Sequence, residues 1–253
     1  MELDHIALAG RDTSTAFVTL TGELGGTVLQ GTHSRGFRPV QVRVGDAERG
    51  LIVELLEPHE PEVDDFLERF LVARGEGPHH ITFKTRDLVA EIDRLRALGL
   101  TPVGIQIDAT HWKECFLSPR EAHGTVVQIT QGGLPFASFA DHFDHARAEG
   151  PHAEPQWWPT PPPRAATPTF VERIVVASPT PEAVAAFYRD AMLGTCTARP
   201  DGGFDLTWPG GGSIRVVSDP TGPTRIHHLE ATGPGPARRL TLVGTTVEVA
   251  PTG

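Results

Sequence analysis

The chain has 253 residues, of which 39% are hydrophobic, and it carries a formal net charge of −10. This composition is typical of a soluble globular protein with one large or two small domains. The sequence contains no run of Lys and Arg, so we expect binding neither to nucleic acid nor to an anionic membrane. It begins almost at once with a strand-like segment and shows no signal or long apolar stretch, which favours a cytoplasmic location.

The first part of the chain predicts a strand, a helix and three further strands. Leu3–Ala9 is rich in apolar residues and ends at a glycine, as strands do. A helix is expected over Thr13–Leu24, because hydroxyl residues lie near its start and two glycines follow it. Three strand-like pieces come next: Thr27–Gln30, Val40–Val44 and Leu51–Leu56. The order is therefore β-α-β-β-β.

The same pattern then recurs. Apolar residues at helical spacing predict a connecting helix over Pro61–Arg74. A strand, an amphipathic helix and three strands follow, over His79–Lys84, Asp87–Leu98, Val103–Ile107, Trp112–Leu117 and Thr125–Thr130. Each copy leaves one hydrophobic sheet face that needs a partner, so the repeat predicts that the two copies pair.

The rest of the chain begins with a segment that breaks the pattern. Residues 134–168 contain a His-rich stretch and a cluster of three prolines, which predicts a linker. Within it, His142 and His145 have a spacing compatible with metal ligation, although a solvated helix face is the favoured interpretation. A third copy follows, with Phe170–Ala177, Pro181–Leu193, Gly203–Trp208 and Ser213–Val217. A shortened fourth copy contains Arg225–Ala231 and Thr245–Val249, and a Gly-Pro run replaces its helix.

These segments predict an α+β fold in which tandem βαβββ modules form a cupped mixed sheet, followed by a second, degenerate domain. We expect the boundaries to be 1–133 for the first domain, 134–168 for the linker and 169–253 for the second domain. The two cysteines, Cys115 and Cys196, form no Cys-x-x-Cys motif. Cys115 lies in an apolar run, which predicts a buried structural thiol.

Four polar residues occupy matched positions in the two complete copies. Each copy has a His on its first strand and a Glu or Gln on its last, namely His5 and Glu54, then His80 and Gln128. Alternate side chains of a strand face one side, so one donor from each of four adjacent strands can converge. Two imidazoles, one carboxylate and one amide oxygen suit a divalent ion such as Zn, Co, Ni, Mn or Fe. We therefore predict one metal site with open positions for substrate oxygens.

The segments LDHIALA, VELLEP, GEGPHHITFKTRDL and HGTVVQITQ resemble the vicinal-oxygen-chelate (glyoxalase/bleomycin resistance/dioxygenase) superfamily, and within it methylmalonyl-CoA epimerase and its glyoxalase-like relatives. The resemblance covers roughly residues 1–132. It implies two βαβββ modules that form a cup around one metal, with His5, Glu54, His80 and Gln128 as ligands. The same alignment, applied to the C-terminal part, predicts a degenerate glyoxalase-like domain there.

The chain departs from the pattern of the epimerases at the catalytic positions. There, the position of Glu54 usually holds Gln, the position of Gln128 holds a Glu that also acts as a base, and a second catalytic Glu falls near Gln41. An amide cannot act as a general base near neutral pH. Exchanging the two modules suggests a mirrored site, in which Glu54 is ligand and base and Glu114 is the second acid–base group. The alternative for Glu114 is an exposed strand charge or a salt bridge.

In the C-terminal half, the positions of the four ligands are held by Arg173, Arg215, His228 and Glu248. Arginine cannot ligate a metal, so this half is expected to be structural or to act as a lid. An anion pocket is conceivable, but a salt bridge between Arg215 and Glu248 is the favoured interpretation.

Three functions fit these residues. The first is a metal-dependent isomerase, epimerase or lyase that moves a proton next to a metal-chelated carbonyl of a small acyl or keto substrate. The second is an extradiol-type dioxygenase, which needs two His and one carboxylate. The third is a non-catalytic drug-binding protein. We expect a small-molecule substrate as partner and no cofactor besides the metal; whether the chain forms a homodimer is left open.

Overall fold

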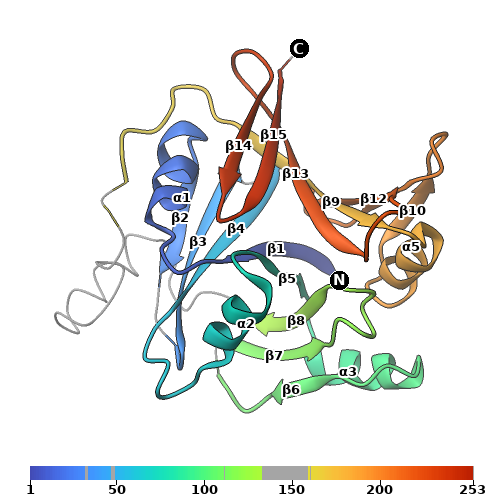
Figure 1. The fold of residues 1–253 in the computed structure, drawn as a ribbon. Helices are drawn as coiled ribbons and strands as arrows, with labels where there is room; N and C mark the ends of the chain where they lie inside the picture. The colour runs from blue at the N-terminus through green and yellow to red at the C-terminus, as the bar shows by residue number, and fades with distance from the viewer. Residues whose placement is uncertain (32–33, 47–48, 111, 133–158, 160, 253) are drawn as a thin grey trace. The chain divides into compact units, whose positions relative to one another are not determined.

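The computed structural model describes residues 1–31, 34–46, 49–110, 112–132, 159 and 161–252. Two mixed β-sheets and a few helices confirm the predicted α+β class (Figure 1). None of the helices in these ranges is both long and apolar enough to cross a membrane. His142 and His145 lie outside the described residues, as does most of the predicted linker.

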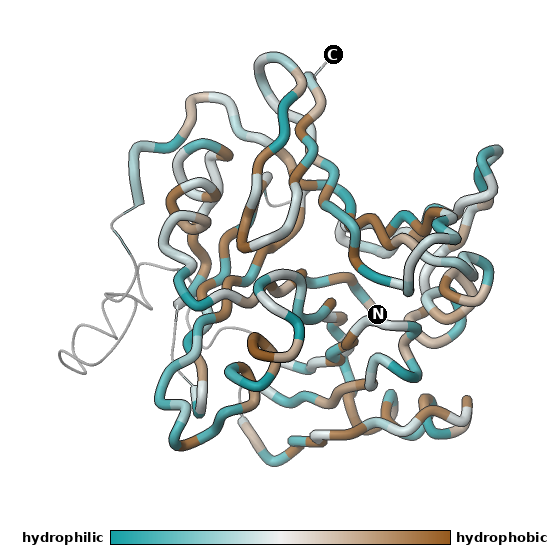
Figure 2. The backbone as a smooth tube through the Cα atoms, in the orientation of Figure 1, coloured by the Kyte–Doolittle hydropathy of each residue, from teal (hydrophilic) through white to brown (hydrophobic). Residues whose placement is uncertain are grey.

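The first sheet has eight strands in the order β2-β3-β4-β1-β5-β8-β7-β6. These strands are β1 (Glu2–Ala9), β2 (Thr27–Gly31), β3 (Phe37–Gly45), β4 (Gly50–Pro58), β5 (Gly77–Lys84), β6 (Val103–Gln106), β7 (Trp112–Leu117) and β8 (Val126–Gly132). The helices of the two copies are α1 (Ser14–Val18), which continues as a π-helical turn η1 (Thr19–Glu23), and α3 (Leu88–Ala97). Hydrophobic and hydrophilic residues alternate along α3, so one of its faces can pack (Figure 2).

The second sheet has seven strands in the order β10-β11-β12-β9-β13-β15-β14. These strands are β9 (Phe170–Ser178), β10 (Thr195–Ala198), β11 (Phe204–Thr207), β12 (Ser213–Ser218), β13 (Arg225–Gly233), β14 (Arg238–Leu242) and β15 (Thr245–Pro251), and the helix of the third copy is α5 (Pro181–Asp190). The order repeats that of the first sheet with one edge strand missing. The predicted third copy and the shortened fourth copy are therefore confirmed, and the third copy contains the further strand β10.

Two differences from the predicted elements have local causes. The connecting helix α2 spans Phe66–Arg74 and does not begin at Pro61. Residues 60–63 form a turn instead, closed by a hydrogen bond from Val63 N to Glu60 O, and the helix starts after Asp64, whose carboxylate accepts from Phe66 N. Strands β10 and β14 were not predicted. Most of their residues are exposed or half-buried, so they lack an apolar pattern.

The chain packs as two compact units, each built from three separate segments. One contains Met1–Ile6, His79–Gly133 and Glu172–Glu230, and the other contains Ala7–Pro78, Leu134–Val171 and Ala231–Gly253. In the first unit, the rings of Tyr188 and Trp208 lie against Phe83, with centroids 6.2 and 5.1 Å away. Cys115 is fully buried, as predicted, and burial raises its pKa to about 12.

In the second unit, helix α2 covers part of the first βαβββ copy. Its apolar side chains join a buried cluster of Ala7, Ala9, Leu56, Leu67 and Leu71, against which Phe37, Phe66 and Phe70 pack. The rings of Phe37 and Phe66 meet edge to face, with centroids 5.3 Å apart. The helix therefore closes over the small side chains that follow His5 on β1.

We predict that Leu67→Ala lowers the free energy of unfolding by about 2–5 kcal/mol, because it removes a fully buried side chain and leaves a cavity. Val72 on the same helix is 76% exposed, so Val72→Ala should change the free energy by less than about 0.5 kcal/mol. Chemical denaturation of the two variants measures this difference. Equal effects would show that α2 does not pack as described.

Candidate metal centre

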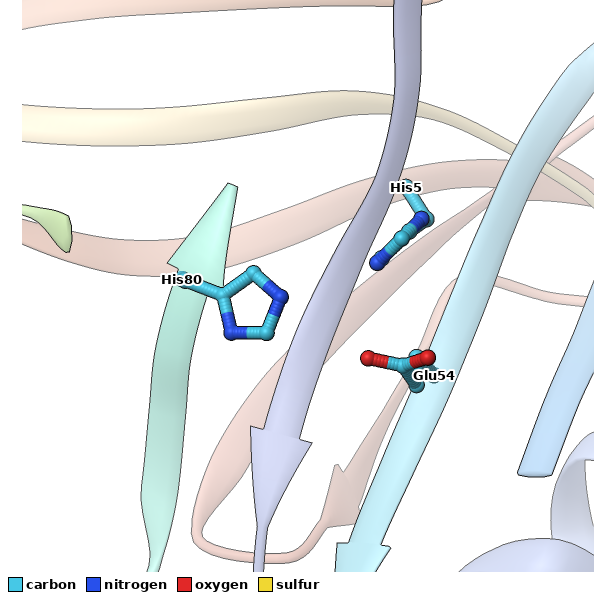
Figure 3. A group of neighbouring side chains, drawn as sticks. All are labelled: His5, Glu54 and His80. Carbon is cyan, nitrogen blue, oxygen red and sulfur yellow. The ribbon is translucent and has the colours of Figure 1, made fainter. Parts of the chain in front are cut away.

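Three of the four predicted ligands converge. His5 on β1, Glu54 on β4 and His80 on β5 come from adjacent strands of the first sheet, and their side chains point toward one another (Figure 3). One ligand atom of each lies within 4.8 Å of those of the other two. All three residues are buried, with 1%, 8% and 5% of their surface exposed.

A carboxylate holds the ring of His5. Nδ1 of His5 lies 2.7 Å from Oδ2 of Asp4, whose Oδ1 accepts from Nζ of Lys84 at 2.8 Å. Burial alone would raise the pKa of Asp4, but the hydrogen bond with His5 and the charge of Lys84 lower it to about 2. An ionised Asp4 that accepts from Nδ1–H leaves the lone pair of Nε2 for a metal, an arrangement typical of ligating histidines.

Burial also prepares His80 for ligation. Desolvation, together with the neighbouring His79 and His5, holds the pKa of His80 well below its usual value. Its imidazole is therefore neutral near pH 7, and metals bind the neutral form.

An amide holds the carboxylate of Glu54. Gln41 lies directly opposite Glu54 in the β3–β4 register, and its Nε2 donates to Oε1 of Glu54 at 2.9 Å. Gln41 occupies the position where the resemblance expects a second catalytic Glu. Here it serves as a hydrogen-bond donor to the carboxylate on the neighbouring strand.

The fourth predicted ligand, Gln128, connects to this group through a threonine. Oγ1 of Thr82 donates to Oε1 of Gln128 at 2.6 Å and lies 2.9 Å from Nε2 of His5. Nε2 of Gln128 donates to Oε2 of Glu114 at 2.8 Å, and Nε1 of Trp112 donates to the same oxygen at 2.9 Å. Glu114 is thus neither a free surface charge nor paired with a cation in these contacts.

The register of β7 and β8 refines the mirrored arrangement that we predicted. Phe116 lies opposite Gln128, whereas Glu114 lies opposite Thr130. Glu114 therefore reaches Gln128 diagonally, two residues along the strand from the position that mirrors Gln41. Each copy nevertheless has one carboxylate and one amide joined by a hydrogen bond across its last two strands.

Sequence reasoning missed Asp4 and Thr82 as parts of the site. Thr82 carries a usable signal, because it lies two residues after His80 and so shares its face of the strand. Asp4 carries only its position next to His5. The donor set of two imidazoles and one carboxylate, with neutral His80 and an oriented His5, fits a divalent ion.

The second sheet has a different composition at the same positions. Arg173 pairs with Ser213 in the parallel register of β9 and β12, as His80 pairs with Val126 in that of β5 and β8. Asp205 lies opposite Arg215, as Gln41 lies opposite Glu54. The predicted correspondence therefore holds in register for Arg173 and Arg215, and both arginines form ion pairs.

The predicted salt bridge between Arg215 and Glu248 is wrong. Arg215 binds Asp205 at 2.8 Å and Glu230 at 3.0 Å, and Arg173 also binds Glu230. Glu248 instead pairs with Arg239 at 2.6 Å. The imidazole of His228, whose Nε2 lies 3.9 Å from Oε1 of Glu230, and the bonds and charges of the two arginines lower the pKa of Glu230 to about 2, although burial opposes this shift.

The paired βαβββ copies and the convergent His and carboxylate side chains define a candidate metal-binding protein of the paired-module class. Residues 4–116 match the family model described as the Glyoxalase/Bleomycin resistance protein/Dioxygenase superfamily. This part of the chain is therefore similar to that superfamily, and the match covers less than half of the chain. No curated protein sequence matches the chain.

Among solved structures, a hypothetical protein from Staphylococcus aureus is similar over 99% of both chains, with 12% identity and a TM-score of 0.65. This likeness shows that the fold is shared over the whole length. A methylmalonyl-CoA epimerase in complex with methylmalonyl-CoA and NH4+ has 25% identity over 52% of this chain and 94% of its own, with a TM-score of 0.46. The epimerase from Mycobacterium tuberculosis has 23% identity over 53% and 89%, with a TM-score of 0.46.

We predict that acid destabilises the protein partly through Glu230. Its folded pKa of about 2 lies below the ordinary value of 4.5, so its contribution is complete above that value and is lost as the pH falls toward 2. Glu230→Gln should therefore flatten the decline of unfolding free energy between about pH 5 and pH 2.

Chemical denaturation across this pH range measures the effect. Glu248→Gln is the control, because Glu248 is 38% exposed and pairs with a well-exposed arginine. A decline as steep in Glu230→Gln as in the native chain would contradict the prediction.

Proposed function

We propose that the protein is a metal-dependent isomerase, epimerase or lyase that transfers a proton next to a carbonyl of a small acyl or keto substrate. One observation carries the proposal. The carboxylate of Glu114 lies outside the three-residue ligand group, yet it is bonded to Gln128, which contacts the same Thr82 hydroxyl as His5. A base beside a Lewis-acid site is what proton abstraction next to a carbonyl requires.

Different residues of the chain would hold the metal and transfer the proton. His5, Glu54 and His80 would hold a divalent ion, which would supply the Lewis acidity that makes a C–H beside a bound carbonyl more acidic. The hydrogen bonds that Gln128 and Trp112 donate both go to Oε2 of Glu114, so Oε1 is the oxygen proposed to take the proton. An epimerisation needs a second group that returns the proton on the other face, and Glu54 is the proposed one.

A second candidate is an extradiol-type dioxygenase. The observation that favours it is the composition of the ligand group, since two His and one carboxylate form the triad of many non-haem iron oxygenases. Glu54 would then supply the carboxylate in place of Gln128. Oxygen consumption by the Fe(II)-loaded protein with a catechol would support this candidate over the first.

We predict that the purified chain binds one divalent ion, and that His80→Ala and Glu54→Ala each weaken this binding. The loss should exceed about tenfold, because losing even an outer partner of a metal ligand costs that much. Isothermal titration of chelator-treated protein with Zn²⁺ measures the affinity. His227→Ala, on the second sheet, is the control and should bind like the native chain; an unchanged affinity in both ligand variants would refute the site.

We further predict that Glu114→Gln keeps the metal and loses proton transfer. Exchange of substrate hydrogen for deuterium should fall by about 10²–10⁴-fold, the usual contribution of a general base. The assay uses metal-loaded protein, D₂O and a panel of 2-substituted acyl thioesters and 2-keto acids, with NMR detection. Asp93→Asn, at an exposed carboxylate of α3, is the control. Exchange at the native rate in Glu114→Gln would exclude Glu114 as the base.

A further inference from the structure

We propose that the substrate of this site carries a free carboxylate, which Lys84 binds beside the ring of Trp112. This inference rests on the proposed function, because it takes the metal group as the place where the substrate's carbonyl oxygens bind. It adds a class of substrate: a small organic acid with an anionic group in addition to the oxygens that the metal chelates.

The strand registers put Lys84 on the face of the site. Lys84 pairs with Thr130 in the parallel register of β5 and β8, and Thr130 pairs with Glu114 across β8 and β7. These three residues form a row next to the row of Thr82 and Gln128. Because partners in register project to the same side of a sheet, Lys84 shares its face with the proposed base.

Contacts of the side chain lead from Lys84 back to the ligands. Asp4 bridges Nζ of Lys84 and Nδ1 of His5, so only one carboxylate and one imidazole separate the ammonium from Nε2 of His5. On the other side, Nζ lies 5.9 Å from the ring centre of Trp112, whose Nε1 donates to Glu114. Contacts of the ammonium thus lead through Asp4 to the candidate ligand His5, and through Trp112 to the proposed base.

The ammonium also has capacity for an anion. An ammonium has three N–H donors, and among the described residues Asp4 is the one carboxylate that pairs with Lys84. The side chain of Lys84 is 32% exposed, whereas that of Asp4 is 9% exposed. Asp4 therefore anchors the cation from the protein side, while the other side stays accessible. The net charge of −10 means that affinity for an anion must come from a local cation such as this one.

The other three copies show that the fold does not need a cation at the strand position that Lys84 occupies. The equivalent positions hold Ala9, Ala177 and Thr232, of which the two alanines are buried. Ala9 belongs to the cluster under α2, so the first copy uses this position for packing. The chain contains only two lysines, Lys84 and Lys113. Lys84 thus occupies this strand position in the second copy, which is the copy that contains the proposed base Glu114.

Binding of three hydroxamates to the Zn²⁺-loaded protein tests the inference. Hydroxamates chelate a metal through two neighbouring oxygens; acetohydroxamate is neutral, whereas the monohydroxamates of succinate and glutarate add a carboxylate. At least one of the two acids should bind roughly tenfold to a hundredfold more tightly than acetohydroxamate, as expected for a charge-assisted bond. Lys84→Met should abolish this advantage, measured as the ratio of the affinities for each acid and for acetohydroxamate in protein saturated with Zn²⁺.

Lys113→Met is the matched control. Lys113 lies between Trp112 and Glu114 on β7 and so faces the opposite side of the strand. The variant loses the same charge and should keep the advantage. Should Lys84→Met fail to fold, Lys84→Gln provides the same comparison, and the three hydroxamates test the native chain without any variant.

The outcomes separate the inference from the proposed function. Failure of the native chain to bind Zn²⁺ would overturn both. If Zn²⁺ and acetohydroxamate bind but neither acid binds more tightly, the metal site stands and the carboxylate inference falls. An advantage that survives in the Lys84 variant, or disappears equally in Lys113→Met, would also overturn the role of Lys84.

Discussion

The pairing of β1 with β5 is the constraint on which the rest of the site depends. These are the first strands of two copies of one βαβββ pattern, and they lie side by side in the middle of the eight-stranded order. Each contributes one His, and the centroids of the two rings are 5.7 Å apart. The last strands of the copies, β4 and β8, flank this pair and bring Glu54 and Gln128 next to it. A different order of strands would separate residues that are more than seventy positions apart in sequence.

The same scaffold supports different chemistry at equivalent positions. In the first sheet, each copy joins a carboxylate to an amide, with the carboxylate on β4 in one copy and on β7 in the other. In the second sheet, arginines and carboxylates neutralise each other at these positions. Two arginines that are held by carboxylates cannot accept a metal, so that sheet is suited to a structural role.

The sequence predicted the fold well because its signals are local and repeated. Strand patterns, glycines after helices and the spacing of His and Glu recur, and a repeat makes each weak signal stronger. The sequence did not predict the side-chain contacts within the site. Asp4 and Thr82 touch His5 because of side-chain rotamers and register across strands, which the order of residues does not contain. The alignment likewise predicted the position of Arg215 but not its partner. That partner, Glu230, lies on β13 two residues after His228, and His228 was the residue that the alignment had assigned on this strand.

The hydroxyl of Thr82 has a consequence for the order of events at the site. It carries one hydrogen, and two acceptors compete for it when Asp4 holds Nδ1–H: the Nε2 atom of His5 and the amide oxygen of Gln128. A cation that takes the Nε2 lone pair ends this competition and leaves the hydrogen to Gln128. The amide is then fixed with its nitrogen toward Glu114. Occupancy of the candidate centre would thereby favour the Thr82–Gln128 hydrogen bond, which holds the amide nitrogen toward the proposed base Glu114, so the two sites are coupled through one hydrogen atom.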